Sequence, residues 1–229
     1  MRAYDLAHVA LRDAVADAVA AGDRAGVAAA VYQQGWLLMR QGRLDEAERV
    51  SLATAQEVEP RISQASRHDL GAWGKLLVHA SAAAARNNRP EDAREILRLA
   101  RTAGTALGGA TAVEESSWGR FDWRTVAFQG IENHLVADRP DRVLGLSARL
   151  PAMSTTFGRR HLLDVAQAHA MVRQGDEATA ILGALLDETP EWLRHQRMAT
   201  DTFQAALAAS RRRQLTSAQR RLARFFDVA

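Results

Sequence analysis

The sequence predicts an all-α fold built from antiparallel helix pairs, and three observations support this prediction. Residues that favour helices, chiefly alanine, leucine, arginine and glutamate, dominate the chain. No segment alternates apolar and polar residues over the length of a strand. Glycine and proline fall between the periodic segments and not inside them. We therefore expect helices near residues 5–21, 25–41, 44–58, 68–87, 90–107, 118–137, 140–149, 160–173, 177–187, 191–210 and 217–226.

Four of the connections between these helices share one pattern. Each is a polar turn followed by acidic residues, which suit the positive end of a helix dipole. Each then reaches a small apolar residue, where the second helix can approach the first closely. The four connections occupy residues 40–47, 87–93, 137–143 and 173–180, and their small residues are Ala47, Ala93, Val143 and Ala180. The partner positions in the preceding helices are Gly35, Ser81, Ile131 and Ala168.

Paired helices with small residues at the crossing and a tight turn between them form the tetratricopeptide pattern. The sequence therefore predicts a tetratricopeptide-like α-α superhelix, a right-handed helical-repeat solenoid, as a single domain over residues 1–229. The repeat is irregular, because two long connections interrupt it around residues 59–67 and 104–117. The expected helix pairs lie near 25–58, 68–107, 118–149 and 160–187, and helices within 191–226 cap the array.

Particular stretches also resemble a family. Residues 70–77, the alanine-rich helix after them, residues 89–94 and residues 160–169 are similar to the C-terminal tetratricopeptide region of actinobacterial XRE-type helix-turn-helix transcriptional regulators. The resemblance covers most of the chain and weakens toward the N-terminus. The segment Phe121-Asp122-Trp123-Arg124-Thr125-Val126 departs from the family's usual Phe-Gly-Pro-Thr-Asn-Val, so Thr125 stands in place of the asparagine. The resemblance implies a sensing or interaction domain of a bacterial transcriptional regulator.

A candidate binding groove follows from the pattern of pairs, because the first helix of each pair lines the concave surface of a tetratricopeptide array. Aromatic side chains mixed with a few charged ones suit a peptide or an amphipathic small molecule. An alternative is that Tyr32, Trp36 and Phe128 only pack between repeats. Alignment on the turns places nine residues in the groove: Tyr32, Trp36, Arg40, Lys75, Arg86, Phe128, Glu132, His169 and Arg173.

Two further groups of residues have simpler interpretations. Trp118, Phe121 and Trp123 lie within six positions, which favours a place in the core, with a hydrophobic lid beside the groove as the alternative. His161 and Asp164 favour a half-buried helix face over a metal site. No nucleophile elbow, phosphate loop, zinc-ligand pair or nucleotide fingerprint occurs. We expect no catalytic residue, no metal and no cofactor.

The charges are nearly balanced, with 30 basic and 27 acidic residues and a net charge of +3. Lys75 is the only lysine, and cysteine is missing, which excludes disulfides and suits a reducing cytoplasm. The basic C-terminal segment favours a capping helix with a solvated arginine face, because repeat arrays need a polar outer end. The alternative is a DNA-binding arm formed by Arg211, Arg212, Arg213, Arg220, Arg221 and Arg224.

Three functions remain open at this point. The leading hypothesis is a cytoplasmic sensor domain that binds a peptide, protein or small-molecule signal in its groove, with a homodimer as a further option. The second is a free-standing tetratricopeptide interaction scaffold without a DNA role, and the third is an enzyme with an unrecognised helical site. Under the first hypothesis, the helix near 5–21 resembles the second helix of a preceding pair. We then expect a helix-turn-helix domain upstream of this chain, and only non-specific DNA binding without it.

Overall fold

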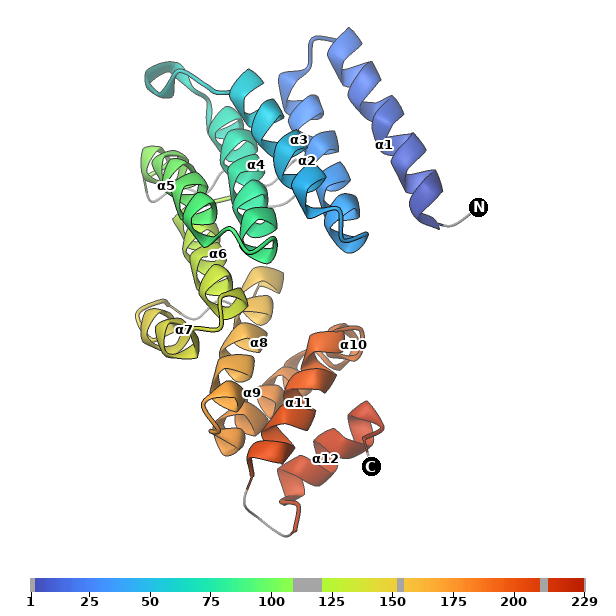
Figure 1. Cartoon of the computed structure of the whole chain (residues 1–229), viewed down its shortest axis with the longest axis vertical. Helices are drawn as coiled ribbons and strands as arrows, with labels where there is room; N and C mark the ends of the chain where they lie inside the picture. The colour runs from blue at the N-terminus through green and yellow to red at the C-terminus, as the bar shows by residue number, and fades with distance from the viewer. Residues whose placement is uncertain (1–2, 109–120, 152–154, 211–213, 229) are drawn as a thin grey trace. The chain divides into compact units, whose positions relative to one another are not determined.

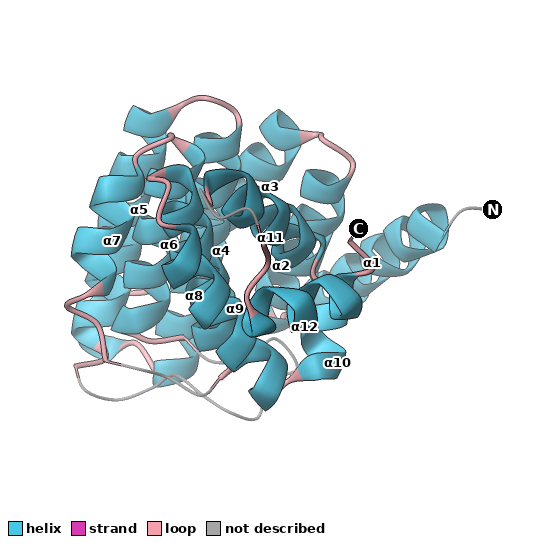
Figure 2. Cartoon of the chain, turned by 90° about the horizontal axis from the view of Figure 1, so that it is seen from below, coloured by secondary structure: helices cyan, strands magenta, loops and turns pink. Residues whose placement is uncertain are grey.

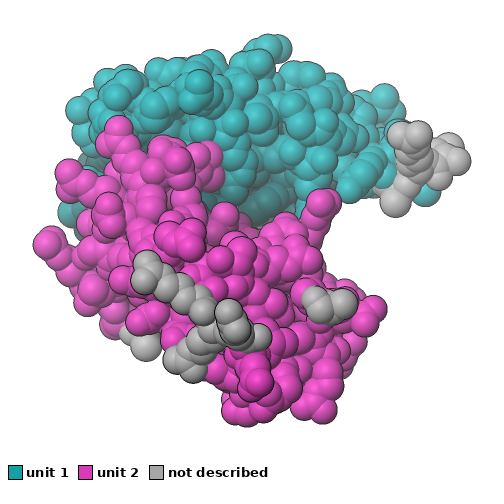
Figure 3. Space-filling model, turned by 60° about the horizontal axis from the view of Figure 1, so that its bottom comes forward, with its two compact units in different colours: residues 1–133 teal, residues 134–229 magenta. Residues whose placement is uncertain are grey.

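The computed structural model describes residues 3–108, 121–151, 155–210 and 214–228. Within these ranges the regular structure is helical and no β-strand occurs (Figure 2). The all-α prediction is therefore confirmed for this part of the chain. The chain divides into two compact units, residues 1–133 (unit 1) and 134–229 (unit 2), whereas the sequence predicts one domain (Figure 3). No helix within the described ranges is long and apolar enough to cross a membrane.

In unit 1 the helices pack mainly on their neighbours along the chain, and α2 also packs on α4 (Figure 1). In unit 2, α11 packs on both α8 and α9, and α12 packs on α9. Unit 1 contains α1 (Ala3–Ala20), α2 (Arg24–Arg40), α3 (Leu44–Glu57), the 3-10 turn η1 (Ile62–Gln64), α4 (Arg67–Arg86), α5 (Pro90–Ala106) and most of α6 (Trp123–Val136). Unit 2 contains the end of α6 followed by α7 (Pro140–Ser147), α8 (Thr156–Met171), α9 (Gly175–Glu188), α10 (Pro190–Arg194), α11 (Arg197–Ala209) and α12 (Ser217–Phe226).

The four similar turns share one backbone geometry. Each contains one residue in the left-handed region, with φ of 74° at Gly42, 57° at Asn88, 56° at Asp138 and 63° at Arg173. The residue after it donates its backbone N–H to a carbonyl five positions earlier, as in Arg43 to Leu38 and Gln174 to His169. This pattern ends one helix and begins the next within a few residues. The turn between α1 and α2 has the same geometry around Gly22, with φ of 67°.

The small residues at the helix crossings are placed as expected in three of the four connections. Ala47, Ala93 and Val143 are buried. Ser81 donates a hydrogen bond from Oγ to the carbonyl of Ala93 at 2.7 Å, so α4 and α5 touch at the predicted position. The fourth assignment is wrong, because Ala180 is exposed.

Ala178 occupies the equivalent place, four residues after the N-cap Gln174, and it is fully buried. Comparison of the four turns in the sequence did not identify Ala178, because it assigned Gly175 to the turn, whereas Gly175 is already the first residue of α9.

Two of the expected helices have clearly different bounds in the structure. The segment 191–210 forms two helices, because the extended backbone of Gln196 (φ −99°, ψ 96°) separates α10 from α11. This break allows Leu193 and Ala199, which lie on opposite sides of it, both to be fully buried. Helix α8 begins four residues earlier than predicted, where the Thr155 side chain accepts from the N–H of Gly158. The first residues of the predicted helix 118–137 lie outside the described ranges.

The aromatic segment before α6 is partly core and partly surface. Phe121 is fully buried, and its ring lies so close to Gly74 that a Cβ there would be 2.2 Å from the ring. Trp123 is 40% exposed, and the Arg124 guanidinium lies 5.3 Å from its ring centroid. The core expectation therefore holds for Phe121 and is wrong for Trp123, while Trp118 lies outside the described ranges.

Candidate functional site

Helix α4 presents three ionisable side chains along one face. Lys75, His79 and Arg86 are spaced four and seven residues apart, so they lie on the same side of the helix. Helix α4 begins with a capping box formed by Ser66 and Asp69, which fixes its start and therefore this face. Lys75 and His79 are buried, at 3% and 2% exposure, although long polar side chains seldom lie so deep.

Two aromatic residues of α2 pack on this face. The Tyr32 ring meets the His79 ring edge-on at 5.3 Å between centroids, and Trp36 meets it at 5.4 Å. The Nζ atom of Lys75 lies 5.4 Å from the centroid of the Tyr32 ring, a distance at which a cation is attracted to the ring face. We call Tyr32, Trp36, Lys75 and His79 the α2–α4 cluster. The cluster joins three of the nine predicted groove residues.

The hydrogen bonds around His79 define its tautomer. Ser51 Oγ donates to the carbonyl of Ala47 at 2.8 Å and lies 3.2 Å from His79 Nδ1. Because the hydroxyl proton is used on Ala47, Nδ1 carries the imidazole proton and donates to Ser51. The Nε2 atom is then a bare acceptor, and it is buried without a hydrogen-bond partner. A buried acceptor without a hydrogen bond is energetically costly, so a ligand that donates a hydrogen bond to Nε2 would be stabilised there.

Burial also changes the protonation of the cluster. Desolvation lowers the pKa of Lys75 to about 8. Desolvation, helped by the positive charge of Arg86, lowers the pKa of His79 to about 3, so this imidazole is neutral at physiological pH. Burial raises the pKa of the Tyr32 hydroxyl, while a hydrogen bond from Trp36 opposes that rise. The α2–α4 cluster therefore contains a neutral base and an amine that loses its proton near pH 8.

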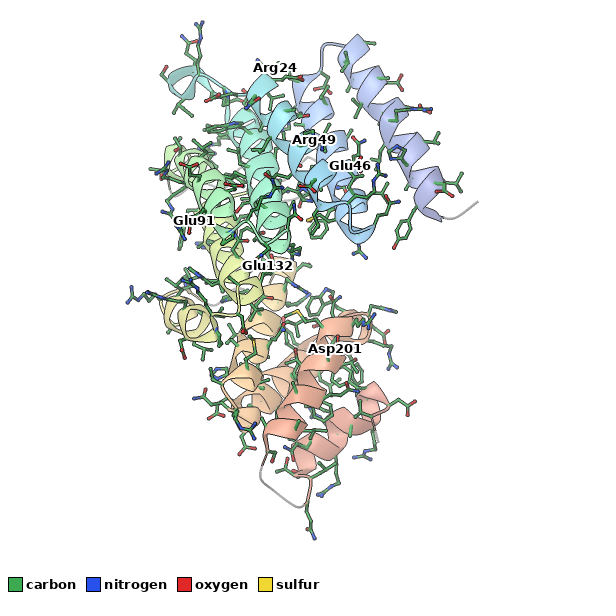
Figure 4. All side chains as sticks on the ribbon, viewed as in Figure 1. Arg24, Glu46, Arg49, Glu91, Glu132 and Asp201 are labelled. Atoms are coloured by element: carbon green, nitrogen blue, oxygen red, sulfur yellow. The ribbon has the colours of Figure 1, made fainter. Side chains whose placement is uncertain are left out.

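Helix α6 adds a second group of polar contacts to α4. Arg86 donates to Glu132 at 2.5 Å, and both side chains are less than a third exposed. Asn133 donates to Ser81 Oγ at 2.8 Å and accepts from Gln129 at 2.9 Å. Figure 4 labels Glu132 on α6. The contacts of Glu132 and Asn133 hold α6 against α4, and the first of them joins two more of the predicted groove residues, Arg86 and Glu132.

The other predicted residues are placed differently. Phe128 is buried at 8% exposure, which agrees with the alternative that it packs in the interior. Trp36 is 40% exposed, and Arg40 lies exposed in the last turn of α2. His169 and Arg173 belong to unit 2, where His169 Nδ1 lies 2.7 Å from Gln174 Oε1. Of the predicted groove residues in unit 1, only Trp36 and Arg40 therefore offer substantial surface to a partner.

Sequence reasoning missed His79 and Ser51. His79 is one turn after Lys75, so the face shared with Lys75 and Arg86 could have identified it. The contact of Ser51 with His79 comes from α3 and depends on Gly35: a Cβ there would lie 2.5 Å from His79 Cε1. Gly35 was expected only as a contact point between helices, and it also leaves room for the imidazole.

Pockets occur at other places in both units. A pocket of about 420 Å³ in unit 1 lies between the first turn of α2, the loop after α3 and the start of α4, and Figure 4 labels Arg24 at its edge. The Arg24 guanidinium donates to the carbonyl of Glu57 at 2.6 Å. In unit 2 a pocket of about 400 Å³ lies beside the α8–α9 turn, with Arg173 in its wall. Both are open to solvent and have walls of polar and apolar residues, and neither contains a residue of the α2–α4 cluster.

The chain was compared with family models, with curated proteins and with solved structures, and none of the three comparisons found a match.

Proposed function

We propose that this chain is a tetratricopeptide-like binding domain that acts as the sensing or interaction region of a bacterial transcriptional regulator. The observation that supports the binding role most strongly is Trp36, a large aromatic side chain that is 40% exposed yet supported from behind by His79. Tryptophan in such a position is a frequent energetic centre of protein interfaces. The regulatory part of the proposal comes from the family resemblance of residues 70–77, 89–94 and 160–169.

The repeat assignment rests on the recurrent turns. The left-handed residue, the hydrogen bond that follows it and the small residue four positions after the N-cap recur at α2–α3, α4–α5, α6–α7 and α8–α9. In this scheme α2 and α4 are the first helices of two consecutive pairs, and they contact each other directly. The α2–α4 cluster then belongs to the face that a repeat array offers to its ligand.

A partner that covers Trp36 would also affect the packing of the helices behind its ring. Trp36 touches His79, and His79 is hydrogen-bonded to Ser51 of α3, so three helices meet behind the indole ring. A ligand that prefers one arrangement of these helices shifts the population toward it. In the proposed regulator, that shift changes how an attached DNA-binding domain is presented.

The second candidate is an interaction scaffold without a DNA role, and it uses the same surface. The two candidates differ in the rest of the gene: a helix-turn-helix segment in the same reading frame supports the regulator, and a gene without one supports the scaffold. A gel-shift titration of this chain alone provides a second criterion. We expect weak, salt-sensitive binding without sequence preference, because the net charge is only +3. Tight, sequence-selective DNA binding by this chain alone would contradict the proposal that a separate, attached domain recognises the DNA.

The binding role is tested with peptides selected from a random library displayed on phage against the immobilised chain. We expect Trp36→Ala to weaken the selected peptides by roughly tenfold or more, as loss of an interface tryptophan does. Trp123→Ala is a matched control, because Trp123 is also 40% exposed and lies on α6 of the same unit. Circular dichroism verifies that both variants are folded. Peptides that depend on Trp123 and ignore Trp36 would refute the proposed surface.

A further inference from the structure

Lys75 is the only lysine among the 30 basic residues of the chain. Every other cationic position uses arginine, whose guanidinium keeps its proton under all physiological conditions. A lysine amine is smaller and can lose its proton when it is buried. Lys75 therefore differs from the arginines in its chemistry, and it is also buried, at 3% exposure in the middle of α4.

The surroundings of Lys75 keep water away from its amine. Its Nζ atom lies against the Tyr32 ring, and His79 follows one turn later on the same face of α4. Desolvation lowers the pKa of Lys75 to about 8. At pH 7.5 the neutral amine is then roughly two hundred times more abundant than in an exposed lysine of ordinary pKa. Only the neutral amine has the lone pair that attacks a carbonyl carbon.

We propose that the Lys75 ε-amine binds small aldehydes covalently, as a Schiff base, at the α2–α4 cluster. The Nζ lone pair attacks the aldehyde carbon, and the resulting ammonium transfers a proton to the new alkoxide to give a carbinolamine. Loss of the hydroxyl as water then forms the C=N bond, so one aldehyde is consumed and one water is released. No electrons are exchanged with an external oxidant or reductant.

The neighbouring groups suit this reaction. The Nε2 atom of His79 is a buried bare acceptor, so it can accept a hydrogen bond from the hydroxyl of the carbinolamine and hold that intermediate in the site. Tyr32 and Trp36 form an aromatic wall, which favours an aromatic or short aliphatic aldehyde over a sugar. Trp36 is the most exposed member of the cluster, and a rotamer change of its indole is the entry step that this site requires.

The idea that the aldehyde is a regulatory signal rests on the proposed function. The reaction of Lys75 with an aldehyde does not depend on that function. If Lys75 reacts and the selected peptides ignore Trp36, the amine site stands and the peptide-binding surface fails. If the peptides depend on Trp36 and Lys75 does not react, the binding domain stands and the aldehyde site fails. The two experiments therefore fail separately.

The test is reductive trapping with benzaldehyde and sodium cyanoborohydride at pH 7.5, followed by peptide mass mapping. The native chain has two kinds of amine, Lys75 and the N-terminus, so the adducts are easily assigned. The reference is the variant Arg101→Lys, which adds an exposed lysine on α5 of the same unit. We expect the adduct at Lys75 to form at least ten times faster than the adduct at the introduced lysine.

Two controls separate reactivity from accessibility. In urea the buried amine becomes accessible but regains an ordinary pKa, so the rate at Lys75 must fall to that of the introduced lysine. Lys75→Met removes the adduct at position 75 and leaves the N-terminal adduct unchanged. The proposal is overturned if folded protein, verified by circular dichroism, is labelled at Lys75 no faster than at the introduced lysine. It is equally overturned if unfolding accelerates labelling of Lys75.

Discussion

The two units use the same turn geometry and fill their interiors differently. The core of unit 1 contains a lysine and a histidine, Lys75 and His79, beside the aromatic rings of α2. The core of unit 2 is formed by leucines of α8, α9, α10 and α12 around the fully buried Phe203 of α11. Unit 2 also buries His161 and Asp164, but Asp164 has Arg160 3.7 Å away, one turn earlier on α8. The two units therefore share a backbone pattern, but the polar or apolar character of each interior is set by its individual residues.

The largest expected effect tests whether the two units, which are separated by their contacts, also unfold independently of each other. Phe203→Ala removes a fully buried ring from unit 2 and should cost about 3–5 kcal/mol of unfolding free energy. Hydrogen exchange read by mass spectrometry should show the loss of protection in α8, α9, α11 and α12. Protection in α4 and α5 should stay unchanged. An equal loss in both units would show that they unfold as one body.

The next effect concerns the space that unit 1 reserves for His79. Gly35→Ala places a methyl group 2.5 Å from His79 Cε1, and overpacking of this kind costs about 1–3 kcal/mol. Gly145→Ala on α7 of unit 2 is the opposite case, because nothing lies within 4 Å of its added methyl group. That variant should gain about 0.5–1 kcal/mol from helix propensity. Urea unfolding gives both values, and destabilisation of similar size at the two sites would contradict the packing at Gly35.

The third effect is a pH dependence that both units share through different residues. Burial lowers the pKa of His79 to about 3 and of His161 to about 4, from 6.5 in the unfolded chain. As pH falls below 6.5 the unfolded state binds protons first, so folding weakens from there toward pH 4. Each histidine contributes at most about 1.4 kcal/mol per pH unit.

Glutamine variants separate these two contributions. Measured by urea unfolding between pH 4.5 and 7.5, His79→Gln should flatten the pH dependence of unit 1, and His161→Gln that of unit 2. A native pH dependence that persists in unit 1 after His79→Gln would assign it to another group.

The sequence was sufficient for the helices and insufficient for the cluster, for a physical reason. Helix starts such as Thr216, which forms a capping box with Gln219, depend on residues close together in the chain. The contact of Tyr32 with Lys75 was anticipated only as a shared groove, because alignment on the turns places α2 and α4 in equivalent positions. The role of His79 depends on Gly35 and Ser51, which come from two other helices, so no local pattern reveals it.

The break at Gln196 and the exposure of Trp123 were missed for the same reason. Each depends on what lies beside the residue in space: two buried side chains on either side of the break, and an arginine against the indole ring. The clustering of Trp118, Phe121 and Trp123 within six positions predicted a core place for Trp123. Phe121, two positions earlier, is buried, whereas Trp123 is not. Neighbours in sequence can therefore face opposite environments at the start of a helix.

The recurrent turns also bear on how the chain folds. Because a single left-handed residue reverses the chain, consecutive helices are joined by only three residues at α2–α3, α4–α5, α6–α7 and α8–α9. Closing so short a connection loses little chain entropy, and contacts between near neighbours in sequence speed folding. Each hairpin can form while the ribosome is still adding later residues, so the chain can fold from its N-terminus during synthesis.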